Sequence, residues 1–519
     1  MPENRPAASR AWRPPVLLAL LLVAAGLLAV DQRAADATSV VASGARDTAR
    51  RWSGYRIPTN GHADGGWIGG YAIGDTPVFV VTPTRRPNRL GYEAAQVVTD
   101  LHGSRGASRR ATAQAAWVLS KYGGYRDARQ AAAVDAAVYH LLVGGRWRID
   151  HHRGAARIRR SGDPASVSRF ARIMLEQSRT FAGDYQVTAT ATSADLGGTI
   201  EATVTVTAGH HRPAAGLPVA VSAPGAATVQ TVTGDDGRAV AHFPATQPGW
   251  QDVTATVGEV PEHRLYLRMP VKRGQATAAE GGVRRTVDAS VLAAVRGPQT
   301  MSLQASPENL VVGGQAAVTA TIDGDGSARP ATAALFGPFP SASEAVCSGS
   351  SVGTTTATVT ADGSYRLPAV APSAGGYYAW RVVVDGTDTT MPVSGCGAVT
   401  KVRARTTTTA LSQPGAAVGD NVPVQVTVSG VPFQGSVTGT VTLFGPYTSD
   451  ADRQADQCGT IAAGPVSFAH AQGNGTFFAP SIAVLASGFY AWRASTNPDD
   501  LWLGSTSPCL ATGTLMTVP

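Results

Sequence analysis

The sequence GYYAWR at 376–381 is repeated, with one substitution, as GFYAWR at 488–493. This repeated segment indicates the fold of the second half of the chain. A second segment, LFGPF at 335–339, returns as LFGPY at 443–447, so the two copies lie about 110 residues apart. Because side chains alternate between the two faces of a strand, the second Tyr and the Trp of each copy share one face. We expect them to be core residues and not a platform on which a ligand stacks. Short alternating strands between Gly and Pro turns predict a β-sandwich for each copy.

Each copy also carries one early and one late cysteine. An even number of cysteines in an exported protein indicates disulfides, and the repeat favours one bridge within each copy, Cys347–Cys396 and Cys458–Cys509. The alternative is a metal ion held by four thiolates. That site would need the short Cys-x-x-Cys spacing of zinc sites, which the sequence lacks.

Gly-containing turns punctuate both copies. The dipeptides DG at 362–363 and NG at 474–475 are typical of tight hairpins, because they accept positive φ. The run DGDG at 323–326 begins like a calcium loop, but Ala334 stands at the twelfth position, where such a loop needs a carboxylate. We therefore expect a hairpin turn there as well.

These two units resemble the immunoglobulin-like repeats of actinobacterial surface proteins, in which a Gly-x-Tyr-x-Trp strand and a cysteine pair recur. The resemblance implies immunoglobulin-like repeats at 300–404 and 405–519. Upstream, residues 184–273 alternate Val, Thr and Ala without cysteine, and they are similar to bacterial immunoglobulin-like spacer domains. Residues 274–299 contain a Gly pair and several charges, which predict a linker with some helical character.

The N-terminal segment is typical of export. Arg5, Arg10 and Arg13 precede an apolar run over 16–30, and an Ala-Asp-Ala site ends at Ala37. This order predicts a secretory signal peptide over 1–37 that is cleaved after Ala37. The alternative is that the segment is retained as a membrane anchor. Either way we expect an extracellular or cell-surface protein that contacts the membrane only through this N-terminal segment.

Residues 50–183 follow a helical pattern after a β-like start. Asp127 with Gln130 three residues later is a capping-box signature, and an apolar period of helical spacing follows it. A shorter helix is expected over 112–122, and the pair DP at 163–164 opens another, because Pro suits the first helical position. The sequence therefore predicts a multidomain chain, with an α+β N-terminal module followed by three all-β immunoglobulin-like β-sandwich domains.

Segments 71–83, 116–123 and 130–142 are similar to the thioester domains of Gram-positive surface adhesins. In that family a Cys and a Gln form an internal thioester. Here Val80 stands at the position of the Cys, and Asp135 stands at the position of the Gln. Because residues before 347 contain no cysteine, this module cannot capture an amine through a thioester. The resemblance still implies the fold of the module and a position at the tip of a surface protein.

The N-terminal part is strongly basic, since residues 1–180 hold 26 basic and 13 acidic side chains. Guanidinium forks suit phosphate and carboxylate groups, so a run of arginines near Trp147 is a candidate for binding polyanions. Its members are Arg146, Arg148, Arg153, Arg157, Arg159 and Arg160. The expected partners are anionic cell-wall polymers, lipid head groups or host-surface glycans and proteins, and no nucleic acid. The alternative is a solvated loop without a partner.

No pattern in the sequence supplies a convincing catalytic site. GSSVG at 349–353 matches a nucleophile elbow, but the β context lacks the helix that must follow it. The paired histidines at 151–152 and 210–211 have no third ligand, so we expect neither a metal ion nor a cofactor. We expect a non-enzymatic surface protein that displays a basic head on an immunoglobulin-like stalk, for adhesion or cell-envelope interaction. The alternative is a secreted enzyme that acts on the cell wall, with its site in 50–183.

Overall fold

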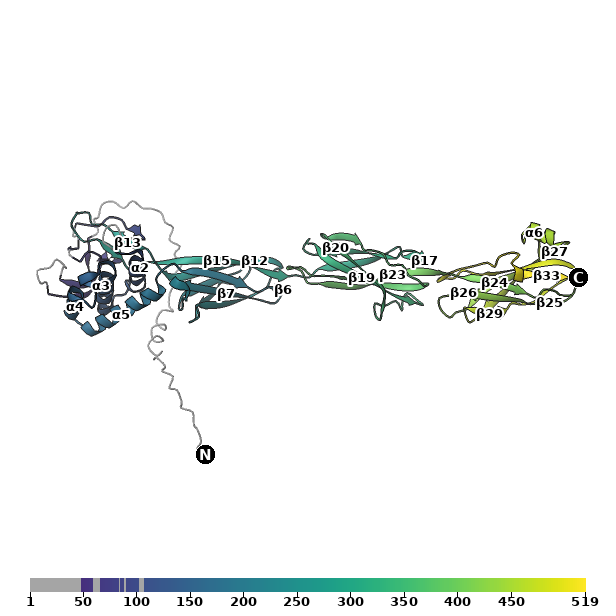
Figure 1. Cartoon of the computed structure of the whole chain (residues 1–519), viewed down its shortest axis with the longest axis horizontal. Coiled ribbons are helices and arrows are strands. Elements are labelled where there is room, and N and C mark those ends of the chain that lie inside the picture. Colours follow the sequence, from purple (N-terminus) through teal and green to yellow (C-terminus); the bar gives the residue numbers. More distant parts are fainter. Residues whose placement is uncertain (1–47, 59–65, 84, 88–89, 102–106) are drawn as a thin grey trace, which may run out of the picture.

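The computed structural model describes residues 48–58, 66–83, 85–87, 90–101 and 107–519. The molecule is elongated, with the long helices gathered in a head at one end and β-sheets following one another toward the C-terminus (Figure 1). The predicted signal peptide or anchor at 1–37 lies outside the described residues. Within the described ranges, no helix is long and apolar enough to cross a membrane.

The head contains an antiparallel sheet whose strand order is β1-β2-β3-β14-β13-β4. Four strands come from the start of the chain: β1 Arg50–Arg56, β2 Trp67–Ile73, β3 Thr76–Val80 and β4 Gln96–Val98. The other two, β13 Leu265–Arg268 and β14 Ala278–Glu280, come from much later in the sequence. Ala278 pairs with Val80, and Ala279 pairs with Phe79. The head is therefore built from two separate stretches of the chain.

The linker predicted over 274–299 is wrong. This stretch forms β14 and then β15 Arg284–Arg296, a strand of the module next to the head. Ala278 and Ala279 are fully buried because small side chains let the segment enter the middle of the head sheet. Composition alone suggested a linker, because the partner strand of β14 lies about 200 residues earlier in the chain.

Four helices cover the head sheet and pack on one another: α2 Arg109–Tyr122, α3 Ala128–Leu142, α4 His152–Arg159 and α5 Pro164–Phe181. Asp127 caps α3 by accepting a hydrogen bond from Gln130 N at 2.9 Å. The Gln130 side chain does not close a capping box, since it donates to Tyr122 O at 3.3 Å. Asp163 caps α5, with Pro164 at its first position as expected.

The first β-module follows the head and consists of two facing sheets. One sheet has the order β10-β9-β12-β15-β6, and the other has the order β11-β7-β5 with β8 paired to β7. Its remaining strands are β5 Gln186–Ala191, β6 Ala194–Asp195, β7 Thr199–Ala208, β8 Arg212–Pro213, β9 Pro218–Ser222, β10 Val229–Val232, β11 Arg238–Pro244 and β12 Gly249–Pro261. Burial alternates along β7 and β11, so one face of each strand fills the core.

The second β-module has two sheets, β16-β18-β21 and β17-β23-β22-β19-β20. Its strands are β16 Thr300–Ser306, β17 Asn309–Val311, β18 Ala317–Asp323, β19 Arg329–Phe339, β20 Ser351–Val359, β21 Gly363–Arg366, β22 Gly376–Val384 and β23 Val393–Arg405.

The third β-module repeats this plan in the sheets β24-β26-β29 and β28-β27-β31-β33, with a further pair β25-β30. Its elements are β24 Thr407–Ser412, β25 Asn421–Val422, β26 Val424–Ser429, β27 Val437–Tyr447, α6 Asp450–Asp456, β28 Ile461–His470, β29 Gly475–Phe478, β30 Ile482–Ala483, β31 Gly488–Thr496, β32 Trp502–Leu503 and β33 Leu515–Val518.

The repeated Tyr and Trp residues lie in the cores, as the sequence predicts. Tyr378, Trp380, Tyr490 and Trp492 are each at most 2% exposed. The structure joins Cys347 to Cys396 and Cys458 to Cys509, with Cα–Cα distances of 6.1 and 6.2 Å. One disulfide therefore closes each repeat, the pairing that the spacing favours.

The hairpins predicted at 362–363 and 474–475 are wrong. β20 pairs with β19, but β21, which begins at Gly363, pairs with β18 in the opposite sheet. β28 and β29 are separated in the same way. These dipeptides therefore carry the chain from one sheet to the other. The run at 323–326 also crosses between sheets, because β18 and β19 belong to different ones.

The neck between the head and the first β-module consists of three chain crossings, which follow α5, β12 and β14. Arg284 of β15 donates to Ser120 O at 3.0 Å, and Glu262 N donates to Ser120 Oγ at 2.9 Å. Gly123 and Gly281 approach so closely that a Cβ on Gly281 would lie 2.8 Å from Gly123 O. These contacts hold the head in a fixed orientation on the first β-module.

Candidate functional site

Val80 and Asp135 lie on neighbouring elements of the head, at the end of β3 and in the middle of α3. Both residues line one narrow pocket, which is closed on its other sides by aromatic and basic side chains. Val80 is 5% exposed and Asp135 is 2% exposed. The two positions that the thioester-domain resemblance pairs are therefore close together in space.

Asp135 is held by a buried ion pair. Its Oδ2 accepts from Arg157 Nη2 at 2.7 Å and from Gly69 N at 3.2 Å. Arg157 also donates to Trp67 O at 3.0 Å, and its guanidinium lies 4.5 Å from the centre of the Tyr139 ring. A buried carboxylate needs such a partner, since an unpaired buried charge is costly. The pocket is thus filled by a paired carboxylate and cation.

Tyr71 completes the polar wall of this pocket. Burial, with the nearby negative charge of Asp135, holds the pKa of Tyr71 well above its usual range. The phenol therefore stays protonated at neutral pH. Without a thiol, this pocket cannot form the internal thioester that the sequence resemblance suggests.

Arg157 does not belong to the predicted polyanion surface. It is 5% exposed, because it lies on the inner face of α4 and points at Asp135. The charge run in the sequence could not reveal this, since α4 turns successive arginines to different faces. Arg157 is therefore a core cation.

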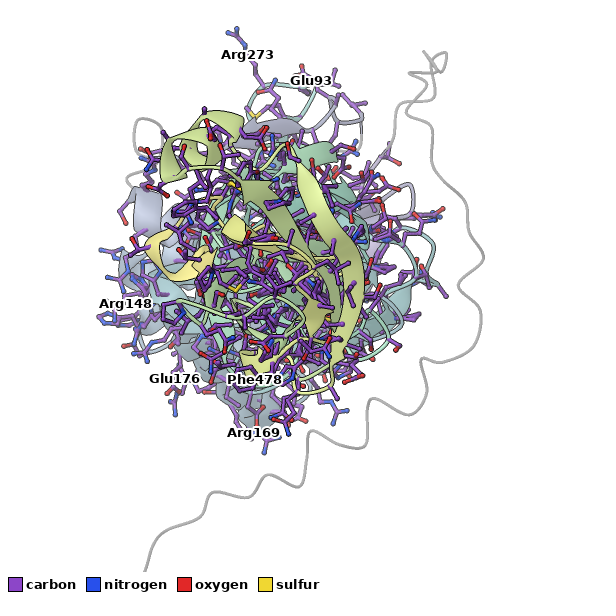
Figure 2. The ribbon with its side chains drawn as sticks, turned by 90° about the vertical axis from the view of Figure 1, so that its right-hand side faces the viewer. Glu93, Arg148, Arg169, Glu176, Arg273 and Phe478 are labelled. Atoms are coloured by element: carbon purple, nitrogen blue, oxygen red, sulfur yellow. A yellow bond between two sulfur atoms is a disulfide. The ribbon has the colours of Figure 1, made fainter. Side chains whose placement is uncertain are left out.

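The other members of the run lie at the surface. Arg146, Arg148, Arg159 and Arg160 are exposed, and Arg148 projects from the side of the molecule (Figure 2). Arg153 is half-buried, and its guanidinium lies 5.5 Å from the centre of the Trp147 ring. The run forms a 3-10 turn, Gly145–Trp147, and α4, where a loop was the alternative. It therefore presents arginines from an ordered surface.

His140 lies beside this basic surface, at the end of α3. Burial, with the nearby positive charge of Arg148, lowers its pKa. The neutral ring accepts a hydrogen bond from Ile149 N at Nδ1, at 3.4 Å. This histidine has a structural role, fixing the turn that carries the arginines.

The structure brings no catalytic or metal-binding group together at the other motifs. Among the described residues, no three His, Cys, Asp or Glu side chains are placed to hold a metal ion. The GSSVG motif at 349–353 runs into strand β20, where a nucleophile elbow would run into a helix. His210 and His211 adopt left-handed backbone conformations, with φ of 57° and 55°.

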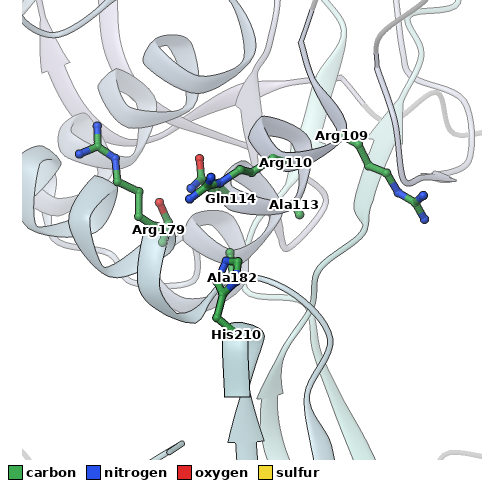
Figure 3. A pocket seen from close by; sticks show the side chains of 8 residues that line it. Arg109, Arg110, Ala113, Gln114, Arg179, Ala182 and His210 are labelled. Atoms are coloured by element: carbon green, nitrogen blue, oxygen red, sulfur yellow. The ribbon is translucent and has the colours of Figure 1, made fainter. Parts of the chain in front are cut away.

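A cleft of about 360 Å³ lies where the head meets the first β-module (Figure 3). It is lined by residues of α2 and α5 and by one residue of the first β-module: Arg109, Arg110, Ala113, Gln114, Ser178, Arg179, Ala182 and His210. Sequence reasoning missed this site because its walls come from distant segments. The sequence held one local signal for this site. Arg109 and Arg110 begin α2, and cations are unfavourable at the positive end of a helix unless they serve another purpose.

No family model matches the sequence, and no curated protein matches it. Among solved structures, the chain is similar to invasin, a bacterial integrin-binding protein, with 17% identity, a TM-score of 0.24, and coverage of 64% of this chain and 60% of invasin. It is similar to the Yersinia pseudotuberculosis adhesin InvE, with 12% identity, a TM-score of 0.19, and coverage of 43% and 60%. A putative membrane anchored protein from Corynebacterium diphtheriae matches with 12% identity, a TM-score of 0.16, and coverage of 64% and 95%. The match spans about 60% of the invasin and InvE chains.

Proposed function

We propose that the chain is an exported, non-enzymatic surface protein that binds anionic cell-wall polymers through the arginine surface of its head. In this proposal the head is an α+β module of 50–183 completed by 262–283, and three immunoglobulin-like domains form its stalk. The observation that carries the proposal is the position of α4, at the end of the head farthest from the C-terminal module (Figure 1). At that end, none of the three β-modules covers the arginine surface.

The arginine surface has the composition that such a partner requires. Arg146, Arg159 and Arg160 are exposed, and Asp150 is the one acidic side chain between positions 146 and 160. Asp150 lies 3.4 Å from Arg148, an exposed ion pair that contributes little to stability. Guanidinium groups bind phosphate and carboxylate bidentately, and several weak contacts along a polymer add through multivalency.

We also propose that Val80 and Asp135 occupy the positions of a lost thioester. Their shared pocket supports this, and the Asp135–Arg157 ion pair would replace the covalent link as the contact that closes it. Adhesion would then rest on reversible, salt-sensitive contacts. Export is proposed from the segment 1–37, and N-terminal sequencing of the secreted protein should find Thr38 as its first residue.

Binding to purified wall polymers tests the proposal. We expect the full chain to sediment with an anionic wall polymer and not with a neutral polysaccharide, and to be released as salt rises. The triple change Arg146→Glu, Arg148→Glu, Arg159→Glu should weaken binding at least tenfold. The control Arg238→Glu, at an exposed arginine of β11 far from the head, should leave binding unchanged.

Three results would contradict the proposal. Unchanged binding in the triple variant would remove the arginine surface from the interaction. Equal or stronger binding to vesicles of anionic lipid, or to a sulfated host glycan, would assign a different partner. Release of soluble fragments from the wall polymer would favour the alternative, a wall-acting enzyme with its site in the head.

A further inference from the structure

The cleft at the neck holds cations that no carboxylate neutralises. Arg110 of α2 and Arg179 of α5 both line it, and neither forms an ion pair within the described part of the chain. The first turn of α2 contains no acidic residue, so the positive end of the helix macrodipole adds to their field. Arg109 lines the rim, and Figure 3 shows its side chain pointing away from the others. The cleft is therefore electropositive.

Gln114 gives the cleft a buried polar group without a partner. The residue is 8% exposed and its side-chain amide makes no hydrogen bond to any described residue, but the amide atoms are not among the fully buried, unpaired ones. The amide therefore keeps its access to the cleft. The amide lines the cleft, so a molecule bound there could complete its hydrogen bonds.

The wall opposite the head is fixed by close backbone contact. A Cβ on Gly209 would lie 2.1 Å from Ala182 O, so this position accepts only glycine. The next residue, His210, reaches the cleft from a left-handed conformation with a φ of 57°, which is strained for a non-glycine residue. Strain of this kind is retained where the surrounding structure imposes it. The backbone thus fixes the position of His210 at the cleft.

We propose that this cleft binds the phosphate group of a small organic phosphate. The guanidinium groups of Arg110 and Arg179 would hold the phosphate oxygens, and the Gln114 amide would bond an ester or hydroxyl oxygen beside them. Ala113 and Ala182 would contact the carbon skeleton. A cleft of about 360 Å³ suits such a molecule, since small-molecule sites begin at about 300 Å³.

Charge favours a phosphate over a carboxylate as the bound group. A phosphate monoester carries a charge of about −1.5 to −2 near neutral pH, whereas a carboxylate carries one negative charge. Two uncompensated arginines and the positive end of α2 match the dianion more closely. This site lies at the neck and is separate from the arginine surface of α4, so either one can fail without the other.

Calorimetric titration of the full chain with glycerol 3-phosphate, inorganic phosphate and acetate tests the proposal. We expect both phosphates to bind and acetate to bind at least tenfold more weakly. Tighter binding of glycerol 3-phosphate than of inorganic phosphate would identify an organic phosphate as the ligand. Arg110→Gln and Arg179→Gln should each weaken phosphate binding at least tenfold. The control Arg172→Gln, at an exposed residue of the same helix α5, should change nothing.

Gln114→Leu separates a binding role from a structural one. Leu has a similar size but cannot form a hydrogen bond with a ligand, so we expect weaker phosphate binding and no fall in the thermal midpoint without ligand. A lower midpoint with unchanged binding would assign Gln114 to the core and contradict the proposal. So would the absence of binding heat with either phosphate up to about 20 mM, or binding that persists at full strength in the double variant Arg110→Gln, Arg179→Gln.

Discussion

The second and third β-modules have the same apolar core but use different groups at one end of it. In the second, Arg329 is buried and forms ion pairs with Asp325 at 3.1 Å and Asp362 at 2.7 Å. In the third, the residue that begins the matching strand β27 is Val437, which is fully buried. Asn474 replaces Asp362, and its side chain bonds both backbone groups of Val431, each at 2.8 Å.

This difference shows that the same fold accepts either a buried cation with its ion pairs or an apolar side chain at the start of the matching strand. A buried ion pair gains little net stability over an apolar replacement, but removing one partner is costly. The change from Arg329 to Val437 is accompanied by the change from Asp362 to Asn474, so neither repeat leaves a buried charge alone. The two positions therefore differ together between the repeats.

The conserved Trp shows a second difference between the repeats. Trp380 Nε1 donates to Thr400 Oγ1 at 3.2 Å. Trp492 Nε1 is buried and has no hydrogen-bond partner among the described residues. Thr400 pairs with Tyr378, whereas Met516 pairs with Tyr490 at the matching place. The third β-module has exchanged a hydrogen bond for apolar packing.

The largest expected effect comes from removing a disulfide. Replacing Cys347 and Cys396 by Ala should lower the free energy of unfolding of the second β-module by about 4 kcal/mol, because the bridge closes a long loop. Replacing Cys458 and Cys509 should cost more, since Cys458 is also buried against Phe444. Hydrogen exchange of β22 and β31 in the full chain measures each module separately.

Ser348→Ala, at an exposed neighbour of Cys347, serves as the control for the disulfide variants and should leave exchange unchanged. Equal protection of β22 with and without the bridge would show that the disulfide does not stabilise the module. A smaller loss in the third β-module than in the second would contradict the packing role assigned to Cys458.

A smaller effect is expected from breaking the buried ion pair. Arg329→Val alone should destabilise the second β-module by about 2 kcal/mol, because Asp325 and Asp362 lose the charge-assisted hydrogen bonds from the buried guanidinium. Arg329→Val combined with Asp362→Asn introduces the residues found at 437 and 474 of the third β-module but keeps Asp325, so it should regain about half of the loss. Urea-dependent hydrogen exchange of β22 measures both. If the double variant is no more stable than the single one, the two positions are not coupled.

Acid should weaken the second β-module through Asp325. Burial alone would raise its pKa, but hydrogen bonds from Thr387 and Thr389 lower it to about 2. Because the folded protein favours the ionised form, this stabilisation is complete above about pH 4 and disappears as the pH falls toward about 2. Asp325→Asn should flatten the pH dependence of β22 exchange over this window. An unchanged slope would show that other carboxylates control the acid response.

The smallest effect concerns the Trp hydrogen bond. Thr400→Val keeps the shape of the side chain and removes the acceptor of Trp380, so the second β-module should lose about 1 kcal/mol. The control Thr358→Val changes an exposed Thr of β20 and should cost less. The free energy of unfolding of the second β-module is measured from the hydrogen exchange of β22 at increasing denaturant concentration. An equal loss of stability in Thr400→Val and Thr358→Val would show that the Trp380 hydrogen bond does not stabilise the module.

Local signals in the sequence predicted the features that depend on neighbouring residues. The period-two pattern placed Tyr378 and Trp380 in the core, and the repeated spacing of the cysteines favoured the pairs that the structure forms. Asp127 and Asp163 cap helices where their side chains can reach the backbone three residues later. These features need no knowledge of the rest of the fold.

Features that depend on distant contacts could not be predicted in this way. The dipeptide at 362–363 permits a turn but does not say which sheet receives the next strand. Strand β14 is short and Ala-rich, and only its pairing with β3 shows that it belongs to the head. Arg157 looks like its neighbours until Asp135 is placed beside it. The cleft at the neck combines α2, α5 and His210, which no local pattern connects.

The three crossings at the neck have a mechanical consequence. A tensile load between the head and the far end would pass through a single chain segment at each later junction, near Gly297 and near Arg405. At the neck, β15 leads directly from that first junction back to β14, which lies between β3 and β13 in the head sheet. A load that enters at Gly297 would therefore act along β15 on β14, which is held by three residue pairs with β3 and two with β13. The short strand β14 is thus the element through which tension would reach the head.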